Sequence, residues 1–423
     1  MGTGVLARVG QHAAVDTATG RRYHPHMNGL YRWLIFLCLV SAFQYPASAQ
    51  NCGSEAIEKE AEALSGQSVE AMKQRAESGD THAQAVIGHY FIAKRDYAQG
   101  VKWLDKAAAQ NDADAQFMLA GGYKMGWYGL TADDAKAIAL TKRAAEQGHC
   151  VAQLNLGSAY QLGMGGIAKD SVKAAEWFRK SAEQGFPPAE LMLGMAYYRG
   201  DGMHKDEALA EFWVRKAANH GISPAQVMLA QMQQQGSEQV PTNPAEAETL
   251  NKLAAEQGSA PAQFKLGVLY RKGLAGPPDP VRAAQWFEKA LNQGFTPAAY
   301  ELGTMSEVGE GVPQSDEKAF QLYLVAAELG VSRAQVKAAQ MLHVGRGTAL
   351  DLIASYKWLD IATRLDNTEA KSLLTVLARE MKQEQIARAK ALAEDWAADN
   401  ADVIETKGYQ FHEKFEVPPA KSE

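Results

Sequence analysis

Two short sequence marks recur along this chain at a nearly constant interval, and this repetition constrains its fold more than any other feature. One mark is an Ala that is usually followed by Gln, at positions 83, 115, 152, 189, 225, 262, 298, 334 and 370. The other is a Gly, or Asn or Asp in its place, at positions 79, 111, 148, 185, 221, 258, 294, 330 and 366. Both series advance by 32 residues once and by 36 or 37 thereafter. A period of this length indicates stacked two-helix units. The sequence therefore predicts an all-α, right-handed α/α superhelical solenoid of about eight to nine helix-turn-helix repeats with helical caps.

Residues 152–185 show what one repeat contains. The apolar spacing predicts a first helix from Val151 to Leu162, and the glycines of the following turn stop it because glycine tolerates a left-handed conformation. A second helix is predicted to begin near Asp170 or Ser171, which are suitable N-caps. Its Trp177 is interpreted as a wedge between neighbouring repeats and not as a ligand-stacking residue. Trp also stands at the equivalent positions 103, 213, 286 and 358.

The repeats divide the chain into five predicted regions. Residues 1–49 form a leader and signal peptide, with Met27 as the start and cleavage after Ala49. The signal has a positive Arg32, a short apolar run and a small-x-small cleavage pattern. An N-terminal anchor helix is the alternative, but the apolar run is shorter than the ~20 residues of a membrane span. The other regions are an N-terminal helical cap (50–80), the repeats (81–368), a degenerate repeat with a C-terminal capping helix (369–398) and a flexible tail (399–423).

Charge and cysteine content narrow the classes of partner and compartment. The formal net charge of −6 argues against a general nucleic-acid binder, which would carry a basic surplus. Of the three cysteines, Cys38 leaves with the signal, and Cys52 and Cys150 remain 98 residues apart. That separation is hard to close in a solenoid, so we predict that Cys150 is a small, unpaired buried residue. A bridge to Cys52 is the alternative.

The repeat marks resemble the Sel1-like repeat family, a branch of the tetratricopeptide-like α/α solenoids. The family pattern is matched by Ala152-Gln153, Leu156-Gly157, Tyr160, Gly163, Gly165, Ala174, Trp177, Lys180, Ala182 and Gly185. The resemblance covers roughly residues 68–398 and implies protein–protein interaction or scaffolding, with envelope or host-contact roles in exported bacterial members. One cysteine-rich branch is linked with penicillin binding and β-lactam hydrolysis. That branch pairs two cysteines inside each repeat, whereas the repeats of this chain contain only Cys150.

The sequence contains no pattern typical of a catalytic, nucleotide-binding or paired-cysteine site. His82 and His89 are seven residues apart and could share a helix face, but no third ligand is evident nearby. We therefore predict no metal, no cofactor and no enzymatic activity.

The first helices offer the best candidate for a binding surface. In tetratricopeptide-like stacks the first helices line the concave side, and the resemblance implies the same here. The predicted partner-binding residues are Phe117, Lys124, Gln161, Leu191, Tyr198, Arg199, Phe264, Arg271, Lys272, Tyr300 and His343. This mixture suits an extended peptide whose carboxylates are bound by Arg199, Arg271 and Lys272. The alternative is that these positions are simply solvated.

The sequence as a whole favours an exported scaffold or adaptor, periplasmic or secreted, that binds a protein or peptide. We expect no nucleic-acid partner and no stable membrane span after signal cleavage. One alternative is an envelope enzyme acting on cell-wall or β-lactam substrates. Another is a structural envelope component that forms oligomers.

Overall fold

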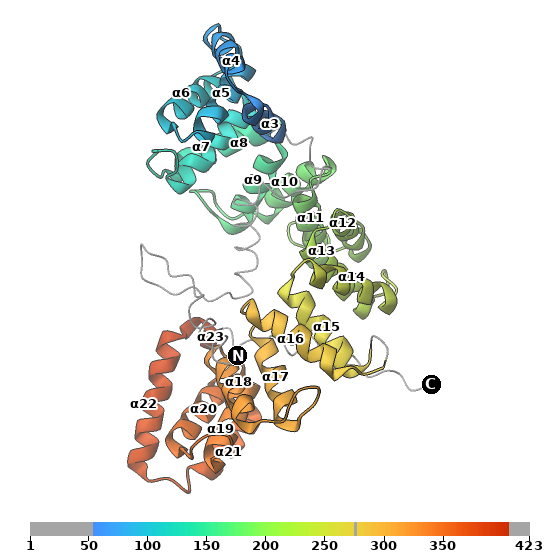
Figure 1. Ribbon diagram of the computed structural model, residues 1–423, viewed down its shortest axis with the longest axis vertical. Helices are drawn as coiled ribbons and strands as arrows, with labels where there is room; N and C mark the ends of the chain where they lie inside the picture. The colour runs from blue at the N-terminus through green and yellow to red at the C-terminus, as the bar shows by residue number, and fades with distance from the viewer. Residues whose placement is uncertain (1–53, 275–276, 406–423) are drawn as a thin grey trace. The chain divides into compact units, whose positions relative to one another are not determined.

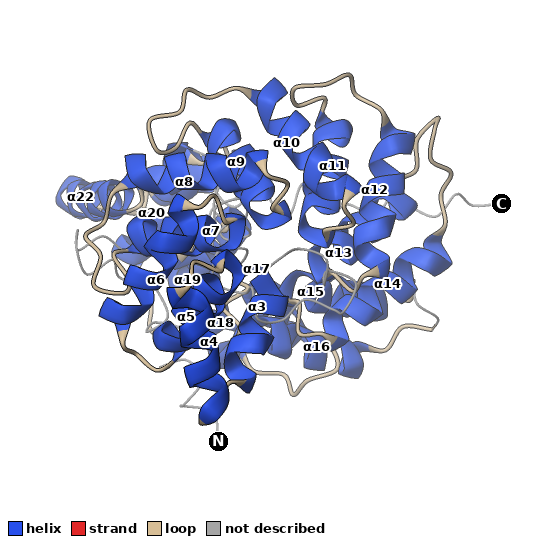
Figure 2. Cartoon of the chain, turned by 90° about the horizontal axis from the view of Figure 1, so that it is seen from above, coloured by secondary structure: helices blue, strands red, loops and turns tan. Residues whose placement is uncertain are grey.

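The computed structural model describes residues 54–274 and 277–405, and this part of the chain contains only helices and the loops between them (Figure 2). The fold class predicted from the sequence is confirmed, with about 20 helices packed pairwise as repeated helix-turn-helix units. The predicted signal peptide, its cleavage site and most of the predicted tail lie outside the described residues. Among the described helices, none combines the length and the apolar content that crossing a membrane requires.

The chain divides into two compact units, whose described parts are residues 54–247 and 248–405 (Figure 1). The N-terminal unit contains α3 (Ser54–Ala63), α4 (Gln67–Glu77), α5 (Thr81–Ala93), α6 (Tyr97–Ala109), α7 (Ala113–Met125), α8 (Asp134–Glu146), α9 (Cys150–Leu162), α10 (Ser171–Glu183), α11 (Pro187–Arg199), α12 (Glu207–Asn219) and α13 (Ser223–Gln235). The boundary falls within α14 (Pro244–Glu256). The C-terminal unit continues with α15 (Ala260–Lys272), α16 (Pro280–Asn292), α17 (Pro297–Val308), α18 (Asp316–Glu328), α19 (Ser332–Val344), α20 (Leu352–Arg364), α21 (Thr368–Leu377), α22 (Gln383–Asp399) and α23 (Ala401–Glu405).

Each repeat is a hairpin whose ends follow from its sequence marks. In the repeat formed by α9 and α10, Gly163 ends the first helix with a left-handed backbone. Asp170 caps the second helix, because its carboxylate accepts a hydrogen bond from the Lys173 backbone N–H at 3.0 Å. The second sequence mark, which closes each repeat, adopts a positive φ even where it is not glycine, at Asn111 (73°) and Asp366 (63°). The predicted helix boundaries and caps of this repeat are therefore confirmed to within a residue.

The two helices of a repeat approach closely at the glycine of the Leu-Gly pair. A Cβ added to Gly157 would lie 2.7 Å from the ring of Phe178, which is almost fully buried. Phe178 follows Trp177, and the equivalent residues are Leu104, Val214, Phe287, Tyr323 and Leu359. The large side chain that faces the first-helix glycine is thus the one after the tryptophan position. Trp177 itself is only partly buried.

The second glycine of the turn joins neighbouring repeats. A Cβ at Gly311 would lie 2.4 Å from the backbone of Pro280, at the start of the second helix of the preceding repeat. Gly347 meets Asp316 and Gly202 meets Ser171 in the same way. All three glycines also have positive φ. The Gly-x-Gly turn is therefore a packing surface as well as a helix stop.

The Gln of the Ala-Gln mark forms hydrogen bonds to two helix ends. One is the end of the second helix of the preceding repeat, and the other is the end of the second helix of its own repeat. The Gln153 amide donates to the carbonyl oxygen of Ala145 at 3.1 Å, and its own oxygen accepts from the amide of Gln184 at 2.6 Å. The same pair of bonds is formed by Gln84, Gln116 and Gln263. Because Gln153 is buried, both ends of its amide need such partners. This requirement explains why the repeat mark contains Gln.

Where the Gln is replaced, its partner is replaced as well. Glu190 stands at the Gln position of the fourth repeat hairpin, and it is fully buried. The partner position holds His220, whose Nδ1 lies 2.9 Å from the Glu190 carboxylate, and Lys216 lies 3.3 Å from the same group. At the corresponding positions further along, Ala299 and Leu329 replace both polar residues with apolar ones. The two positions change together in these two repeats, whereas Gln335 keeps the Gln opposite Leu365.

The C-terminal end is closed by α22 and the short α23. The indole N–H of Trp396 donates to the Glu328 carboxylate at 3.0 Å, and its ring packs edge-on against Trp358. Val403 is buried and fills the space beside Gly330. The predicted tail (399–423) consequently begins too early, because residues 401–405 are helical and Val403 is buried.

Cys150 begins α9 and is fully buried. It is disulfide-bonded, and its partner cysteine lies outside the described residues. Our prediction of an unpaired Cys150 is therefore wrong. The spacing argument assumed that the regular rise of the stack separates the two cysteines.

Candidate interaction surface

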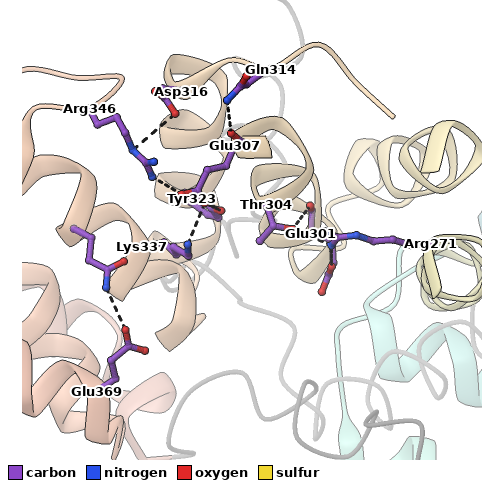
Figure 3. A network of polar contacts seen from close by, with 11 residues as sticks. Arg271, Glu301, Thr304, Glu307, Gln314, Asp316, Tyr323, Lys337, Arg346 and Glu369 are labelled. Carbon is purple, nitrogen blue, oxygen red and sulfur yellow. Dashed lines mark hydrogen bonds and ion pairs between the residues drawn. The ribbon is translucent and has the colours of Figure 1, made fainter. Parts of the chain in front are cut away.

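Three consecutive first helices of the C-terminal unit carry charged or titratable residues at one repeat position. Arg271, Glu307 and His343 lie four residues after the glycine or alanine of the Leu-Gly site, near the ends of α15, α17 and α19. Each of these side chains reaches into the segment that follows its own repeat (Figure 3 shows the first two positions). These contacts form a polar network along the first helices of this unit.

Arg271 is held by two carboxylates of the next repeat. Its guanidinium lies 2.5 Å from Glu301 and 2.7 Å from Glu310, and it also donates to the Thr304 hydroxyl at 2.9 Å (Figure 3). Burial would lower the pKa of Arg271, but the hydrogen bonds and charges of Glu310 and Glu301 outweigh that effect and raise it. The arginine therefore stays charged and fixed in place.

Glu307 is the centre of the next contact, with the charges reversed. Its carboxylate accepts from the Tyr323 hydroxyl at 2.7 Å and from the Lys337 ammonium at 3.1 Å, and it also pairs with Arg346 (Figure 3). Burial alone would raise the pKa of Glu307. The bonds from Tyr323, Arg346 and Lys337 instead lower it to about 2.

The two contacts use the same repeat positions with opposite signs. Glu301 and Lys337 are 36 residues apart and occupy equivalent positions in successive repeats. Glu310 and Arg346 are also equivalent, since each is the middle residue of a Gly-x-Gly turn. A positive centre with negative partners is thus followed by a negative centre with positive partners. The third position holds His343, whose Nε2 lies 2.8 Å from the Glu380 carboxylate, while the two partner positions hold Leu373 and Lys382. Like-charged neighbours would be repelled in a shifted register, so this alternation favours one pairing of adjacent repeats.

These contacts correct the predicted role of Arg271. Its donors are already paired with carboxylates of the same unit, so they are not free for the carboxylates of a partner. Leu191 and Phe264 were also predicted to line the binding surface, yet each is only 3% exposed. Both belong to the core, because the position three residues before the glycine turns toward the second helix.

The remaining predicted residues are accessible to different extents. Arg199 and Lys272 are exposed, and Phe117, Gln161, Tyr198 and Tyr300 are partly buried. Lys124 pairs with Asp134 at 2.9 Å. Phe117 stacks on the ring of His149, which caps α9, with centroids 4.5 Å apart. Some of the predicted binding residues therefore lie at the surface of each unit.

One further position of the first helix is exposed in repeats of both units. The last residue of each first helix, just before the left-handed glycine, is exposed in six repeats. These residues are Met125, Leu162, Arg199, Lys272, Val308 and Val344. Val308 and Val344 in the C-terminal unit are each 65% exposed, and Met125 and Leu162 are the apolar members in the N-terminal unit. We call this set the first-helix row.

The residues considered for metal binding have other environments. His82 pairs with Glu60 at 2.8 Å, whereas His89 is buried in α5. Within residues 54–274 and 277–405, no group of three or more His, Cys, Asp or Glu side chains has the arrangement of a metal site.

Sequence reasoning missed the partners in the network: Glu301, Glu310, Lys337 and Arg346. A comparison of charges at a spacing of 36 residues reveals these partners. Between the two repeats the charge changes sign at the central position (Arg271 to Glu307) and at both partner positions. Examining single repeats could not reveal it, because the pairs join different repeats.

The fold and this geometry define a class of protein, the α/α repeat solenoids whose successive hairpins are joined through polar side chains. Sel1 repeats match the sequence at residues 87–112, 113–149, 150–186, 187–222, 223–259, 260–295, 296–331 and 332–367, and the chain belongs to the Sel1 repeat family.

Two solved structures resemble this chain over most of its length. A Sel1 repeat protein from Oxalobacter formigenes is 27% identical with a TM-score of 0.57, covering 81% of this chain and 99% of that chain. A protective antigen present in uropathogenic Escherichia coli strains, which displays an SLR fold, is 25% identical with a TM-score of 0.53. That comparison covers 88% of this chain and 96% of the antigen. A comparison with proteins of curated function finds no match.

Proposed function

We propose that this chain is an exported, non-catalytic scaffold that binds a protein or peptide along the first-helix face of its repeats. The observation that carries the proposal is the first-helix row, in which apolar side chains recur at one position and remain exposed. Scattered exposed apolar residues need no explanation, whereas a row repeated in register indicates a surface kept for a partner. The Sel1 repeat architecture supports this role, because stacked repeats offer extended binding surfaces.

The partner is proposed to contact Val308 and Val344 in the C-terminal unit. Charged groups beside these valines are paired within the unit, so they hold the surface in shape more than they attract a ligand. Apolar contact would then supply most of the affinity and the fixed charges would limit which partner fits.

A capture experiment with matched variants tests this surface. Residues 50–423 serve as bait in an envelope extract, beside a Val308→Asn/Val344→Asn variant. The control is Val172→Asn/Val281→Asn, since Val172 (55% exposed) and Val281 (53% exposed) lie on second helices. A protein retained by the native chain and by the control, but lost with the first-helix variant, would support the proposal. Equal retention by all three would remove the first-helix row from consideration.

Export to the periplasm or beyond is part of the same proposal. The signal pattern before Gln50 supports it, and a disulfide at Cys150 is compatible with an oxidising compartment. Cell fractionation followed by N-terminal sequencing should find a chain beginning at Gln50 outside the cytoplasm. A cytoplasmic chain that keeps Met27–Ala49 would contradict export. Turnover of a β-lactam or cell-wall substrate by the purified protein would contradict the non-catalytic assignment.

A further inference from the structure

The turn between α7 and α8 carries an exposed group of aromatic side chains. Trp127 is 44% exposed and Tyr97 is 39% exposed. Both pack against Tyr128, with ring centroids 6.2 Å and 5.8 Å apart respectively. We call Tyr97, Trp127 and Tyr128 the aromatic platform. Its rings are contiguous, and Trp and Tyr are enriched in the central contacts of protein interfaces.

The turn holds the platform in one conformation. The backbone N–H of Trp127 donates to Gly122 at 3.0 Å, and its carbonyl accepts from Leu130 at 3.0 Å. Tyr128 lies close against α7, where a Cβ on Gly122 would be 3.0 Å from its ring. Tyr128 also has a φ of 60°, which is costly for a residue other than glycine. A strained turn that displays a tryptophan to solvent suggests selection for the display.

Trp127 differs from most other described tryptophans in having no lysine over its ring. In the described chain, a lysine of the same helix stands over each of five tryptophan rings: Trp103 (4.1 Å), Trp177 (4.0 Å), Trp213 (4.7 Å), Trp286 (3.7 Å) and Trp358 (4.2 Å). Trp396 is buried and donates to Glu328. Within the described residues Trp127 has no such lysine, although it is the most exposed tryptophan. Among the described residues no cation covers its face, and a cation of a partner can stack there.

The charges around the platform favour the same ligand. Asp133 and Asp134 lie in the exposed segment that follows the turn, and Asp134 pairs with Lys124. Glu58 acts electrostatically on Tyr128, and Asp105 acts on Lys136, whose ammonium stands over the ring of Tyr123. Glu58 thus acts on a ring of the platform, and the carboxylates of Asp105, Asp133 and Asp134, with Lys124 and Lys136, form the rim along the same turn. A cationic segment would meet complementary charge at the rim.

We propose that the aromatic platform binds a basic segment of a partner protein, with an arginine or lysine side chain stacked on the face of Trp127. Apolar neighbours of that side chain cover Tyr97, and the rim carboxylates meet the remaining positive charges of the segment. Arginine suits the site best, because its planar guanidinium stacks on an aromatic ring while its N–H groups bond to carboxylates. This inference rests on the protein-binding role proposed above, but it does not depend on the first-helix row.

The test uses two labelled dodecapeptides and the full chain. One peptide alternates arginine with leucine, and the other has glutamate in place of every arginine. Fluorescence anisotropy measures the affinity of the native chain and of Trp127→Ala, which keeps the net charge. We expect the native chain to bind the arginine peptide at least tenfold more tightly than Trp127→Ala does. The glutamate peptide should show no measurable binding to either.

Two further variants keep the test decisive. Phe212→Ala removes an aromatic ring that is 54% exposed on α12, and it should bind the arginine peptide as the native chain does. Trp127→Lys places a repelling cation at the site and should abolish binding even if alanine leaves residual contact. Circular dichroism melting curves check that each variant is folded.

The outcomes separate this inference from the proposed function. Native affinity in Trp127→Ala, or equal binding of the two peptides, would overturn the platform proposal. If Val308→Asn/Val344→Asn loses its envelope partner while Trp127→Ala binds the arginine peptide normally, only the platform fails. If the valine variant keeps its partner and Trp127→Ala loses the peptide, only the first-helix row fails.

Discussion

At the residue scale, two glycines of neighbouring first helices differ in the space around them. Gly157 faces Phe178, and an added Cβ would lie 2.7 Å from that ring and 3.1 Å from the carbonyl of Ala174. We expect Gly157→Ala to lower the free energy of unfolding by about 1–3 kcal/mol, because the two helices must separate to admit the methyl group. Denaturant titration of the variant measures the change.

Gly121 provides the matched control. It lies inside α7, and an added Cβ would meet nothing within 4 Å. Gly121→Ala should therefore stabilise the protein by about 0.5–1 kcal/mol, since alanine restricts the unfolded chain and favours the helix. Equal effects of the two substitutions would show that close approach at Gly157 is unimportant.

His89 makes a second prediction at this scale. Burial lowers its pKa from 6.5 to about 4, and the charge of Asp114 offsets this only in part. A histidine whose pKa is lower in the folded state takes up its proton more readily when unfolded. Stability is therefore complete above pH 6.5 and is lost as the pH falls toward 4. We expect the free energy of unfolding to be about 2 kcal/mol lower at pH 5 than at pH 7.5 from this group alone.

The His89→Leu variant isolates that contribution. It keeps an apolar side chain in the buried site and removes the titrating group. Urea titrations at the two pH values should show a smaller difference in the variant than in the native chain. An unchanged difference would assign the acid sensitivity to other groups.

At the scale of elements, the alternating ion pairs predict that the charges of a whole contact can be exchanged. Arg271→Glu alone removes the positive partner of Glu301 and Glu310 and places a third carboxylate beside them. We expect it to cost about 2 kcal/mol, less than a fully buried pair, because these side chains are partly exposed. Thermal unfolding of the C-terminal repeats would report the loss.

Adding Glu301→Lys and Glu310→Arg copies the arrangement of Glu307, Lys337 and Arg346 into the preceding repeat contact. This triple variant should recover most of the lost stability. Recovery should stay incomplete, because Tyr323 donates to Glu307 whereas the equivalent Phe287 has no hydroxyl. A triple variant no more stable than Arg271→Glu would show that the charges do not act as a register-specific set.

These contacts also show how far the sequence could predict the elements. The helices, caps and turns were predictable because each depends on residues a few positions apart, as Asp170 and Gly163 illustrate. The assignment of Leu191 and Phe264 to the surface failed because burial at those positions depends on the helix that packs above them. Arg271 failed for a related reason, since its partners belong to another repeat. The sequence therefore predicts the fold better than it predicts which residues form the binding surface.

At the scale of the whole molecule, the ends of the chain deviate most from the repeat rule. The sequence predicted the repeats and both caps, yet it placed the end of packed structure before Val403, which is buried beside Gly330. A repeat pattern describes contacts between neighbours in the stack, whereas α23 returns to a turn about 70 residues earlier in the chain. Contacts of this kind leave no periodic signal.

The disulfide of Cys150 leads to the last prediction. The oxidised protein should melt at a higher temperature than the reduced one, because a cross-link restricts the unfolded chain, typically by about 2–4 kcal/mol. Cys150→Ala should melt like the reduced native protein, and reductant should not change it further. Calorimetry with and without reductant checks both statements. A native chain indifferent to reductant would contradict a stabilising cross-link.

The partner cysteine then decides between two N-termini. The chain has three cysteines, so the partner of Cys150 is Cys38 or Cys52. Cys38 lies in the predicted signal, and only a chain that keeps the signal could use it. We expect Cys52→Ala to abolish the effect of reductant and Cys38→Ala to leave it intact in protein purified from the envelope. The opposite result would mean that residues 27–49 remain attached, and the exported chain would then be anchored by the segment that we interpret as its signal.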